Sequence, residues 1–316
     1  MAIIIAEFCQ NHNGDLNLLK EMVWAAAEAG ATYAKVQSML ADELAFRERF
    51  EEGRLAGDRV TVIRRPFQPE YERLKPMDLS NEAYYMFAEE CKRAGIKPLT
   101  TVFTRARLPF VASLGWEAIK VASYDCASFP MILELRDALA RAQCRHLFIS
   151  TGATYDEEIE TTAHLLKGYS FTYLHAVTIY PTPLDQLHLA RLAYLRRYTP
   201  SVGFSDHTLV ARDGIKAAIA AMSLGADVVE RHFTILPPEA TKDGPVSIRP
   251  ELLKQLVDFS KRGILELQEY ARQEIPEYSA MVGQARRPLT PTEELNRDYY
   301  RGRFASRVGD EVVYNW

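Results

Sequence analysis

Residues 118–150, AIKVASYDCASFPMILELRDALARAQCRHLFIS, contain two short apolar runs separated by a helical pattern. We interpret Ala118–Val121 and His146–Ser150 as strands, and Pro130–Ala142 between them carries apolar side chains at helical spacing. Strands that are apolar almost throughout are typical of parallel sheets covered on both faces. This stretch therefore predicts a strand–helix–strand crossover within a parallel sheet.

The same alternation continues in both directions along the chain. The other expected strands are Ile3–Phe8, Thr32–Gln37, Pro98–Phe103, Phe171–Val177, Ser201–Phe204 and Asp227–Phe233. The other expected helices are Leu16–Ala29, Asn81–Ala94, Leu108–Leu114, Glu157–Leu166, Leu187–Tyr198, Ala211–Leu224 and Pro250–Arg272. Eight strand–helix pairs in this order most often close on themselves, so we predict an α/β fold, a (β/α)8 TIM barrel. A doubly wound open sheet is the alternative.

The length of the chain leaves room for additions to the barrel. The chain has 316 residues, whereas such a barrel typically needs about 250. We place the barrel in residues 1–275, with a lid-like insertion at 39–79 and a short C-terminal extension at 276–316. The insertion is either a lid over the barrel mouth or a solvated surface excursion. Residues 288–316 are rich in aromatic and arginine side chains, which suits packing and recognition better than disorder.

The amino-acid composition excludes several classes of protein and partner. Hydrophobic residues make up 47% and charged residues 25%, which is typical of a soluble globular protein. A net charge of −4 without a basic block argues against a nucleic-acid partner. The four cysteines are far apart and form no CxxC pair, which suits a reducing compartment. The apolar N-terminal run is too short for a signal peptide or a membrane span, so we expect a cytoplasmic protein with no membrane partner.

Polar residues gather at the ends of the expected strands. The carboxyl ends of the strands of a parallel barrel meet at one rim, and active sites lie there. The polar residues at or just past these ends are Glu7, Lys35, Gln37, Thr101, Lys120, Ser123, Ser150, Thr151, Thr178, Tyr180, Ser205, Asp206, His207, Glu230, Arg231 and His232. The sequence therefore predicts an active site at this rim.

Lys35 and Lys120 lie inside otherwise apolar strands, where burying an unpaired ammonium group is costly. The hydroxyl groups at the neighbouring strand ends are natural phosphate donors (Thr101, Ser123, Ser150 and Ser205). We favour a bound phosphate or carboxylate as the partner of the two lysines. Two alternatives stay open, namely internal ion pairs with Glu7 or Glu230 and a Schiff-base lysine of lowered pKa.

His207 and His232 end consecutive strands, which places their imidazoles to converge on one metal ion. A site with only two histidines leaves positions for water and substrate, which suits Mn²⁺, Mg²⁺ or Fe²⁺ in a catalytic role. Two histidines alone are a weak indication of a metal site, so hydrogen-bonded core histidines are the alternative.

A series of short motifs resembles the sialic acid (N-acetylneuraminate) synthase family, in that family's order along the chain. The motifs are Ala6-Glu7 with Asn11–Asp15, Ala34–Gln37, Thr100–Phe103, Ile119–Ser123, Ile149–Gly152, Ile179–Pro183, Gly203–Thr208 and Glu230–Thr234. The match covers about residues 2–262, and the last two motifs are its most specific part.

The resemblance implies a metal-dependent condensation of phosphoenolpyruvate (PEP) with an open-chain amino sugar aldehyde. The C3 of PEP attacks the aldehyde, water adds at C2, and the C–O bond breaks to release phosphate and a sialic acid-like 2-keto-3-deoxy sugar acid.

By position, PEP would be bound by Lys35, Thr101, Lys120, Ser123, Ser150, Thr178 and Ser205, and the sugar by Glu7, Gln37, Tyr180 and Asp243. The catalytic residues would be Glu7, His207 and His232. His207 and His232 would bind the divalent ion, Mn²⁺ or Mg²⁺, and Glu7 would transfer a proton or position water. The resemblance also implies a homodimer.

Two positions depart from the family pattern. Thr178 stands where the family usually has asparagine, which keeps a hydroxyl group but loses the amide donors. Arg286-Arg287 resembles the start of a linker that typically leads to an antifreeze-like domain, whose arginine reaches the substrate's acyl group in the partner subunit. Too few residues follow for that domain, so we expect residues 276–316 to stand in its place and the acceptor to be smaller or differently decorated.

Two other functions remain as alternatives. A related synthase would condense PEP with a non-aminated or phosphorylated sugar, as octulosonate and heptulosonate synthases do. A non-catalytic sugar-binding relative would keep the fold without turnover, although Lys35, Lys120, His207 and His232 argue against it.

Overall fold

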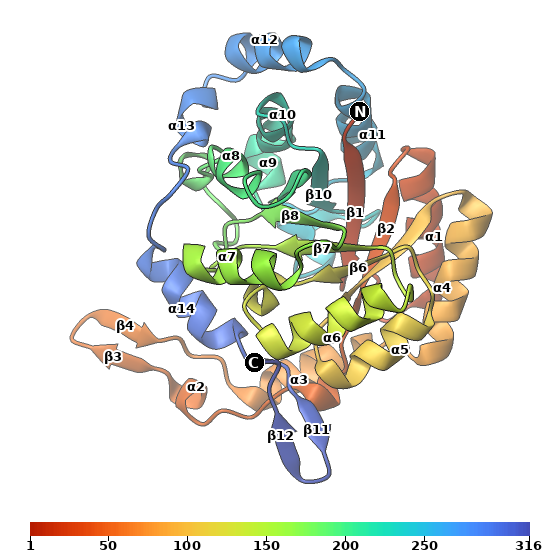
Figure 1. Cartoon of the computed structure of the whole chain (residues 1–316), viewed down its shortest axis with the longest axis vertical. Coiled ribbons are helices and arrows are strands. Elements are labelled where there is room, and N and C mark those ends of the chain that lie inside the picture. Colours follow the sequence, from red (N-terminus) through yellow and green to blue (C-terminus); the bar gives the residue numbers. More distant parts are fainter.

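The computed structural model describes residues 1–316 and contains a closed barrel of eight parallel strands (Figure 1). Around the barrel the strands are β1 (Ile3–Cys9), β10 (Val228–His232), β9 (Val202–Asp206), β8 (Phe171–His175), β7 (His146–Ser150), β6 (Ala118–Val121), β5 (Lys97–Val102) and β2 (Tyr33–Ser38). Strand β2 pairs with β1 and completes the circle. The predicted (β/α)8 barrel is confirmed, and the open-sheet alternative is wrong.

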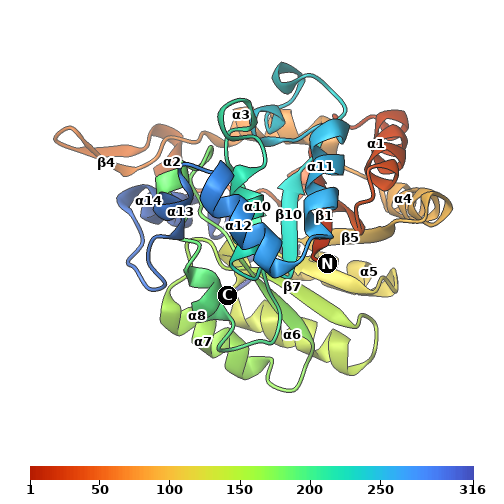
Figure 2. The same ribbon diagram turned by 90° about the horizontal axis from the view of Figure 1, so that it is seen from above.

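Helices surround the barrel (Figures 1 and 2). They are α1 (Leu16–Glu28), α4 (Asn81–Ala94), α5 (Leu108–Ser113), α6 (Phe129–Ala140), α7 (Asp156–Leu165), α8 (Arg191–Leu195), α9 (Val210–Asp213), α10 (Lys216–Ser223), α11 (Pro250–Ser260) and α12 (Ile264–Glu274). Short 3₁₀ turns follow several strands: η3 (Arg105–Arg107), η4 (Ser123–Asp125), η5 (Leu184–Gln186), η6 (Pro238–Ala240) and η7 (Gly244–Val246).

The core has two parts. A cluster of 62 buried residues packs the helices onto the outside of the strands. A second cluster of seven residues, with Leu99 and Phe148 among them, takes one side chain from each of seven barrel strands. Because these side chains contact one another across the barrel, they fill its interior below the strands' carboxyl ends. The polar strand ends therefore lie on a packed floor.

Local sequence explains several element boundaries. The Asp15 side chain caps α1 by accepting hydrogen bonds from the backbone N–H groups of Asn17 and Leu18. Ser80 caps α4 in the same way. Gly95 ends α4 with a φ of 75°, a conformation that a Cβ atom would make costly. The predicted bounds of α4, β6 and β7 agree with the structure.

The helix expected at Leu187–Tyr198 is wrong in its first turn. Only α8 is helical there, because the preceding backbone binds a distant segment instead. The N–H groups of Leu189 and Ala190 donate to the carbonyls of Met281 and Val282, at 2.9 and 2.8 Å. Tertiary contacts therefore replace the helical hydrogen bonds at this point.

Two other expected helices are each divided in two. Ala211–Leu224 breaks at Gly214, whose φ of 55° interrupts the helix between α9 and α10. Pro250–Arg272 breaks before Gly263, whose extended backbone begins α12. Gly214 permits its change of direction through its positive φ, whereas the φ of −68° at Gly263 is open to any residue.

The insertion after β2 is folded. It contains η1 (Ala41–Glu43), α2 (Arg49–Glu52), the hairpin β3 (Arg54–Ala56)–β4 (Arg59–Val62), α3 (Phe67–Leu74) and η2 (Lys75–Met77). The hairpin projects from the body of the molecule (Figures 1 and 2).

The chain ends with α13 (Tyr278–Val282), α14 (Pro291–Tyr300) and the hairpin β11 (Ser306–Val308)–β12 (Glu311–Val313). This C-terminal segment is hydrogen-bonded to the insertion. The Ala45 N–H donates to the Arg303 carbonyl and the Ala305 N–H donates to the Glu43 carbonyl, both at 2.9 Å. Insertion and C-terminal segment therefore form one continuous structure.

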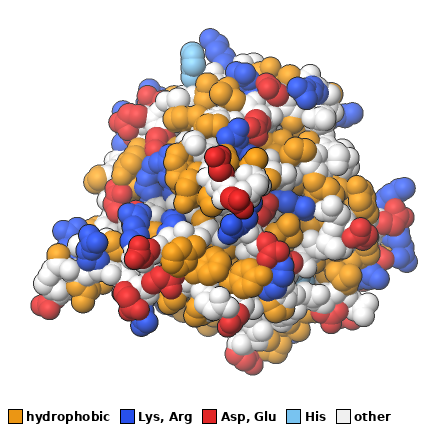
Figure 3. All heavy atoms as spheres, turned by 90° about the horizontal axis from the view of Figure 1, so that it is seen from below, with side chains coloured by type: hydrophobic (Ala, Val, Ile, Leu, Met, Phe, Trp, Pro, Cys, Tyr) orange, Lys and Arg blue, Asp and Glu red, His pale blue; other side chains and the backbone are white.

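On the face shown in Figure 3, positively and negatively charged side chains are mixed with hydrophobic ones. None of its helices is both long enough and apolar enough to span a lipid bilayer.

Candidate active site

A cavity of about 810 Å³ opens where the barrel strands end. It is lined by all but one of the residues to which the sequence gives a binding or catalytic role, namely Glu7, Lys35, Gln37, Thr101, Lys120, Ser123, Ser150, Tyr180, Ser205, His207, His232 and Asp243. The exception is Thr178. It is fully buried behind the wall, and its hydroxyl group has no hydrogen-bond partner.

Both expected lysines lie buried at the floor of the cavity. Lys35 forms an ion pair with Glu7 and donates a hydrogen bond to Thr101 Oγ1 at 2.9 Å. The barrel register explains the ion pair, because Glu7 of β1 and Lys35 of β2 are cross-strand partners. Lys120 donates to Ser150 Oγ at 2.6 Å. Each ammonium group therefore already has a hydroxyl group in contact.

Glu230 lies between the two lysines. Its carboxylate oxygens are 3.7 Å from Lys35 Nζ and 3.9 Å from Lys120 Nζ. Ser205 Oγ donates to the same carboxylate at 2.8 Å. Internal ion pairs with Glu230 are thus present for both lysines, and Lys35 also pairs with Glu7, whereas no carboxylate lies within hydrogen-bond distance of Lys120. Lys120 is the lysine better placed to meet an added anion.

Burial lowers the pKa of both Lys35 and Lys120, because the ammonium group is poorly solvated there. Burial alone would raise the pKa of Glu230, but the charges of the two lysines lower it overall. An anionic ligand would stabilise the charged lysines further. Lys120 is therefore the group at this floor to which an anionic ligand would add a contact.

His207 and His232 lie together at the cavity wall, with ring centroids 5.3 Å apart. Next to them in the chain, Asp206 and Arg231 form a buried ion pair outside the cavity. Because these two residues are cross-strand partners in β9 and β10, their ion pair holds the histidine-bearing strand ends together. The structure therefore brings the two histidines to one point, as their spacing predicts.

The ring nitrogens of the two histidines are only partly satisfied. Tyr180 Oη lies 3.3 Å from His207 Nε2, but Nδ1 of both rings is buried without a hydrogen-bond partner. Buried polar atoms are normally paired, so these orphaned nitrogens favour a ligand role over a packing role. Burial lowers the pKa of both histidines, which keeps them in the neutral form that binds metals.

A three-residue donor group lies beside His207. Cys9, His232 and Asp243 offer ligand atoms that all lie within 4.8 Å of one another. Sulfur, nitrogen and oxygen donors around one point fit a divalent metal ion. The only signal for Cys9 in the sequence is its position just past the end of the expected strand Ile3–Phe8. Asp243, expected to contact sugar, lies within this donor group.

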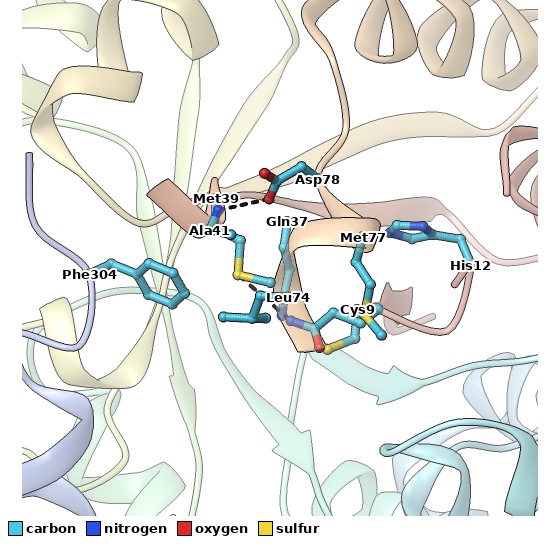
Figure 4. Close-up of a pocket in the computed structure, with 10 residues that line it drawn as sticks. Cys9, His12, Gln37, Met39, Ala41, Leu74, Met77, Asp78 and Phe304 are labelled. Carbon is cyan, nitrogen blue, oxygen red and sulfur yellow. Dashed lines mark hydrogen bonds between the residues drawn. The ribbon is translucent and has the colours of Figure 1, made fainter. Parts of the chain in front are cut away.

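A narrow pocket adjoins the cavity at Cys9 (Figure 4). The picture shows Phe304 of the C-terminal segment and His12 of the first loop on opposite sides of it. Ala41 N–H donates to Asp78 at 2.8 Å, which ties the two ends of the insertion together. His12 lines this pocket and not the main cavity, and its Nδ1 accepts a hydrogen bond from the Gly14 N–H. Its contacts are thus those of a loop-shaping residue.

The C-terminal segment supplies part of the main cavity wall. The lining residues from this segment are Thr292, Asn296, Tyr300, Gly302, Arg303, Phe304 and Asn315. Tyr300 stacks on Tyr124, with ring centroids 4.9 Å apart and planes inclined by 14°. Asn296 Nδ2 donates to the Thr178 carbonyl at 2.6 Å.

Comparison with known proteins gives consistent matches. The NeuB family model matches residues 22–269. The N,N'-diacetyllegionaminic acid synthase of Legionella pneumophila is 32% identical over 270 residues, which cover 80% of this chain and 70% of that protein. The enzyme of the same name from Campylobacter jejuni is 29% identical over 264 residues, covering 80% and 74%.

Among solved structures, the N-acetylneuraminic acid (sialic acid) synthetase of Leptospira borgpetersenii in complex with citrate superposes with a TM-score of 0.70. It is 24% identical, and the match covers 94% of this chain and 90% of that one. At this identity the superposition supports the barrel fold alone.

Proposed function

Because the chain belongs to the NeuB family, we propose that it condenses PEP with the open-chain form of an amino sugar. The product is a sialic acid-like 2-keto-3-deoxy sugar acid, and phosphate is released. One observation carries the proposal: two buried lysines and a ring of hydroxyl groups form the floor of the cavity. The relatives named as synthases of a sugar acid support the same reaction class.

The floor of the cavity binds PEP in this proposal. One anionic group of PEP is bound by Lys120 and Ser150, and the other is bound by Lys35 and Thr101. The phosphate and the carboxylate therefore each contact an ammonium group. Ser123 and Ser205 add hydroxyl donors from the adjacent strand ends.

Gly152 keeps this floor compact. A Cβ atom on Gly152 would lie 2.7 Å from Thr178 Cγ2 and 2.9 Å from Ser123 Oγ. Glycine therefore lets the end of β7 approach both residues. Thr178 lies behind the cavity wall. In this proposal it supports the backbone at the end of β7, which carries the PEP contact Ser150.

The remaining chemistry takes place above the floor. His207 and His232 would hold a divalent ion, Mn²⁺ or Mg²⁺, which when bound supplies Lewis acidity to the aldehyde oxygen. Glu7 accepts a hydrogen bond from the Cys9 N–H at 2.5 Å and pairs with Lys35. Its carboxylate is thereby fixed at the cavity wall, where we place proton transfer or the orientation of water. Gln37 and Tyr180 would contact the sugar.

The C-terminal segment closes the acceptor end of the cavity in this proposal. Residues 1–275 form the synthase barrel, residues 39–79 its cover, and residues 276–316 the wall that meets the sugar. The stacked rings of Tyr124 and Tyr300 offer an apolar face of the kind that sugar C–H groups contact.

A phosphorylated acceptor is the second candidate, and one observation favours it. Arg65, Arg73, Lys242 and Arg303 all line the cavity. A single carboxylate, Glu70, contacts three of them: Arg73, Lys242 and Arg303. The excess positive charge suits a phosphate group on the sugar.

The test is acceptor-dependent phosphate release. The purified protein is incubated with PEP, Mn²⁺ and paired acceptors, each amino sugar being supplied with and without a terminal phosphate ester. We expect phosphate release with at least one mannosamine-type acceptor, and the paired sugars separate the two candidates. Phosphate release with none of the acceptors would refute both.

A further inference from the structure

Three donor atoms from distant parts of the chain converge beside the cavity. Cys9 ends β1, His232 ends β10, and Asp243 lies in the loop between η6 and η7. Their ligand atoms all lie within 4.8 Å of one another. Cys9 and His232 are 7% and 8% exposed, and the Nδ1 atom of His232 has no hydrogen-bond partner.

The backbone at Cys9 is held in an uncommon conformation. Its φ is 48°, in the left-handed region that residues with a Cβ atom seldom adopt. The pairing register between β1 and β2 also shifts between Glu7 and Cys9. A bulge of this kind redirects a side chain, and here it places the Cys9 sulfur 2.9 Å from Asp243 Oδ2. Such strain persists when surrounding contacts fix it, and it is frequent at functional sites.

The loop that carries Asp243 is anchored to the same region. The buried Asn11 side chain donates to the Phe233 carbonyl at 2.9 Å and to Ser247 Oγ at 3.0 Å. Ser247 Oγ in turn donates to the Asp243 carbonyl at 2.7 Å. The side-chain amide of Asn11, in the loop after Cys9, therefore binds both the backbone just past His232 and the loop that carries Asp243. The three donors are positioned by this network without help from substrate.

We propose that Cys9 and Asp243 bind the divalent metal together with His232, so that the site includes a cysteine sulfur as well as imidazole ligands. His207, whose ring centroid lies 5.3 Å from that of His232, stays the second imidazole ligand. The inference rests on the proposed function only in placing the metal at this end of the cavity. Thiolate ligands favour softer ions such as Zn²⁺, Cd²⁺ or Co²⁺, whereas Mg²⁺ prefers oxygen ligands. The side chain of Cys9 is thus expected to set the metal preference.

Metal binding by the purified, metal-stripped full chain tests this directly. With Co²⁺ we expect a near-ultraviolet charge-transfer band from a cobalt–thiolate bond. Cys9→Ser should lose the band, while Cys126→Ser, which changes another buried cysteine that is absent from the donor group, should keep it. Cys9→Ser should also lower Cd²⁺ affinity at least about tenfold and Mg²⁺ affinity much less. An unchanged band in Cys9→Ser, or Co²⁺ binding without a band in the native protein, would overturn the proposal.

X-ray absorption on the Zn²⁺-loaded native protein gives an answer that needs no variant. We expect a sulfur neighbour at about 2.3 Å from zinc, and a shell of only nitrogen and oxygen at about 2.0–2.2 Å would contradict the proposal. The outcome is independent of turnover. A protein with the sulfur ligand but without phosphate release would refute the proposed function alone, and the converse would refute this inference alone.

Discussion

Arg303 forms a salt bridge with Glu70, although the two residues are 233 positions apart in the chain. Their side chains are 13% and 15% exposed. The contact joins the C-terminal segment to α3 of the insertion and places the Arg303 side chain on the cavity wall. This part of the cavity wall is therefore built by the two segments that lie outside the barrel strands and helices.

Replacing Arg303 should impair use of the acceptor more than use of PEP. In Arg303→Gln we expect the KM for the acceptor to rise about 5- to 30-fold, because a charge-assisted contact at a partly buried position contributes roughly 1–2 kcal/mol. The KM for PEP should stay within about twofold. Steady-state kinetics with each substrate varied in turn measures both. Arg307→Gln, which changes an exposed arginine of β11, is the control, and an unchanged acceptor KM in Arg303→Gln would remove Arg303 from the acceptor site.

Lys120 should be required for PEP binding. In Lys120→Ala a buried phosphate or carboxylate loses its ammonium partner, so we expect PEP affinity to fall by about 100-fold or more. Calorimetric titration of PEP into the protein measures this. Lys97→Ala serves as the matched control, because Lys97 is an exposed lysine of the neighbouring strand β5 that pairs with Glu117. Equal PEP affinity in native protein and Lys120→Ala would place PEP elsewhere.

Gly152 should tolerate no side chain. Gly152→Ala brings a Cβ atom against Thr178 and Ser123, so we expect a loss of about 1–3 kcal/mol in the free energy of unfolding and weaker PEP binding. Removing the methyl group in Gly152→Ala/Thr178→Ser should restore part of the stability. Urea denaturation measures both variants. Gly263→Ala is the control, since a Cβ atom there meets nothing within 4 Å, and equal stability of Gly152→Ala and native protein would contradict the packing argument.

Asp125 should make stability depend on pH. Burial raises the pKa of Asp125 to about 6, against hydrogen bonds from Asn315 and Ser128 that lower it. Because the folded state binds the proton more tightly, the contribution of this group to stability is full below about pH 4 and is lost as pH rises through 6.

The variant Asp125→Asn isolates that contribution. The difference in unfolding free energy between native protein and variant should shift by up to about 3 kcal/mol between pH 4 and pH 7, in favour of the variant at the higher pH. Denaturant titrations at a series of pH values give the difference directly. A difference that is the same at every pH would show that Asp125 titrates normally.

The fold was predictable from local pattern. Parallel strands buried on both faces have an apolar sequence signature, and alternation with helices leaves few topologies. The prediction failed where distant contacts decide the backbone, as at Leu189 and Ala190, whose N–H groups bind the C-terminal segment. Nothing in the local sequence indicates such a partner.

The site was predictable to the extent that the barrel defines it. Lys35, Lys120 and His232 follow from strand ends alone, because closure brings all strand ends to one rim. Cys9 could not be recognised in this way, since its orientation depends on a bulge and a positive φ. Arg303 and Tyr300 could not be placed either, because their positions depend on how a distant segment folds back over the barrel.

The fate of the bridging oxygen of PEP distinguishes the proposed condensation from simple PEP hydrolysis. PEP labelled with ¹⁸O between C2 and phosphorus is incubated with the protein, metal and acceptor, and the released phosphate and the sugar acid are analysed by mass spectrometry. We expect acceptor-dependent release of labelled phosphate, together with a product whose mass equals that of acceptor plus PEP plus water minus phosphoric acid. Phosphate release that does not depend on an acceptor, or label retained in the organic product, would contradict it.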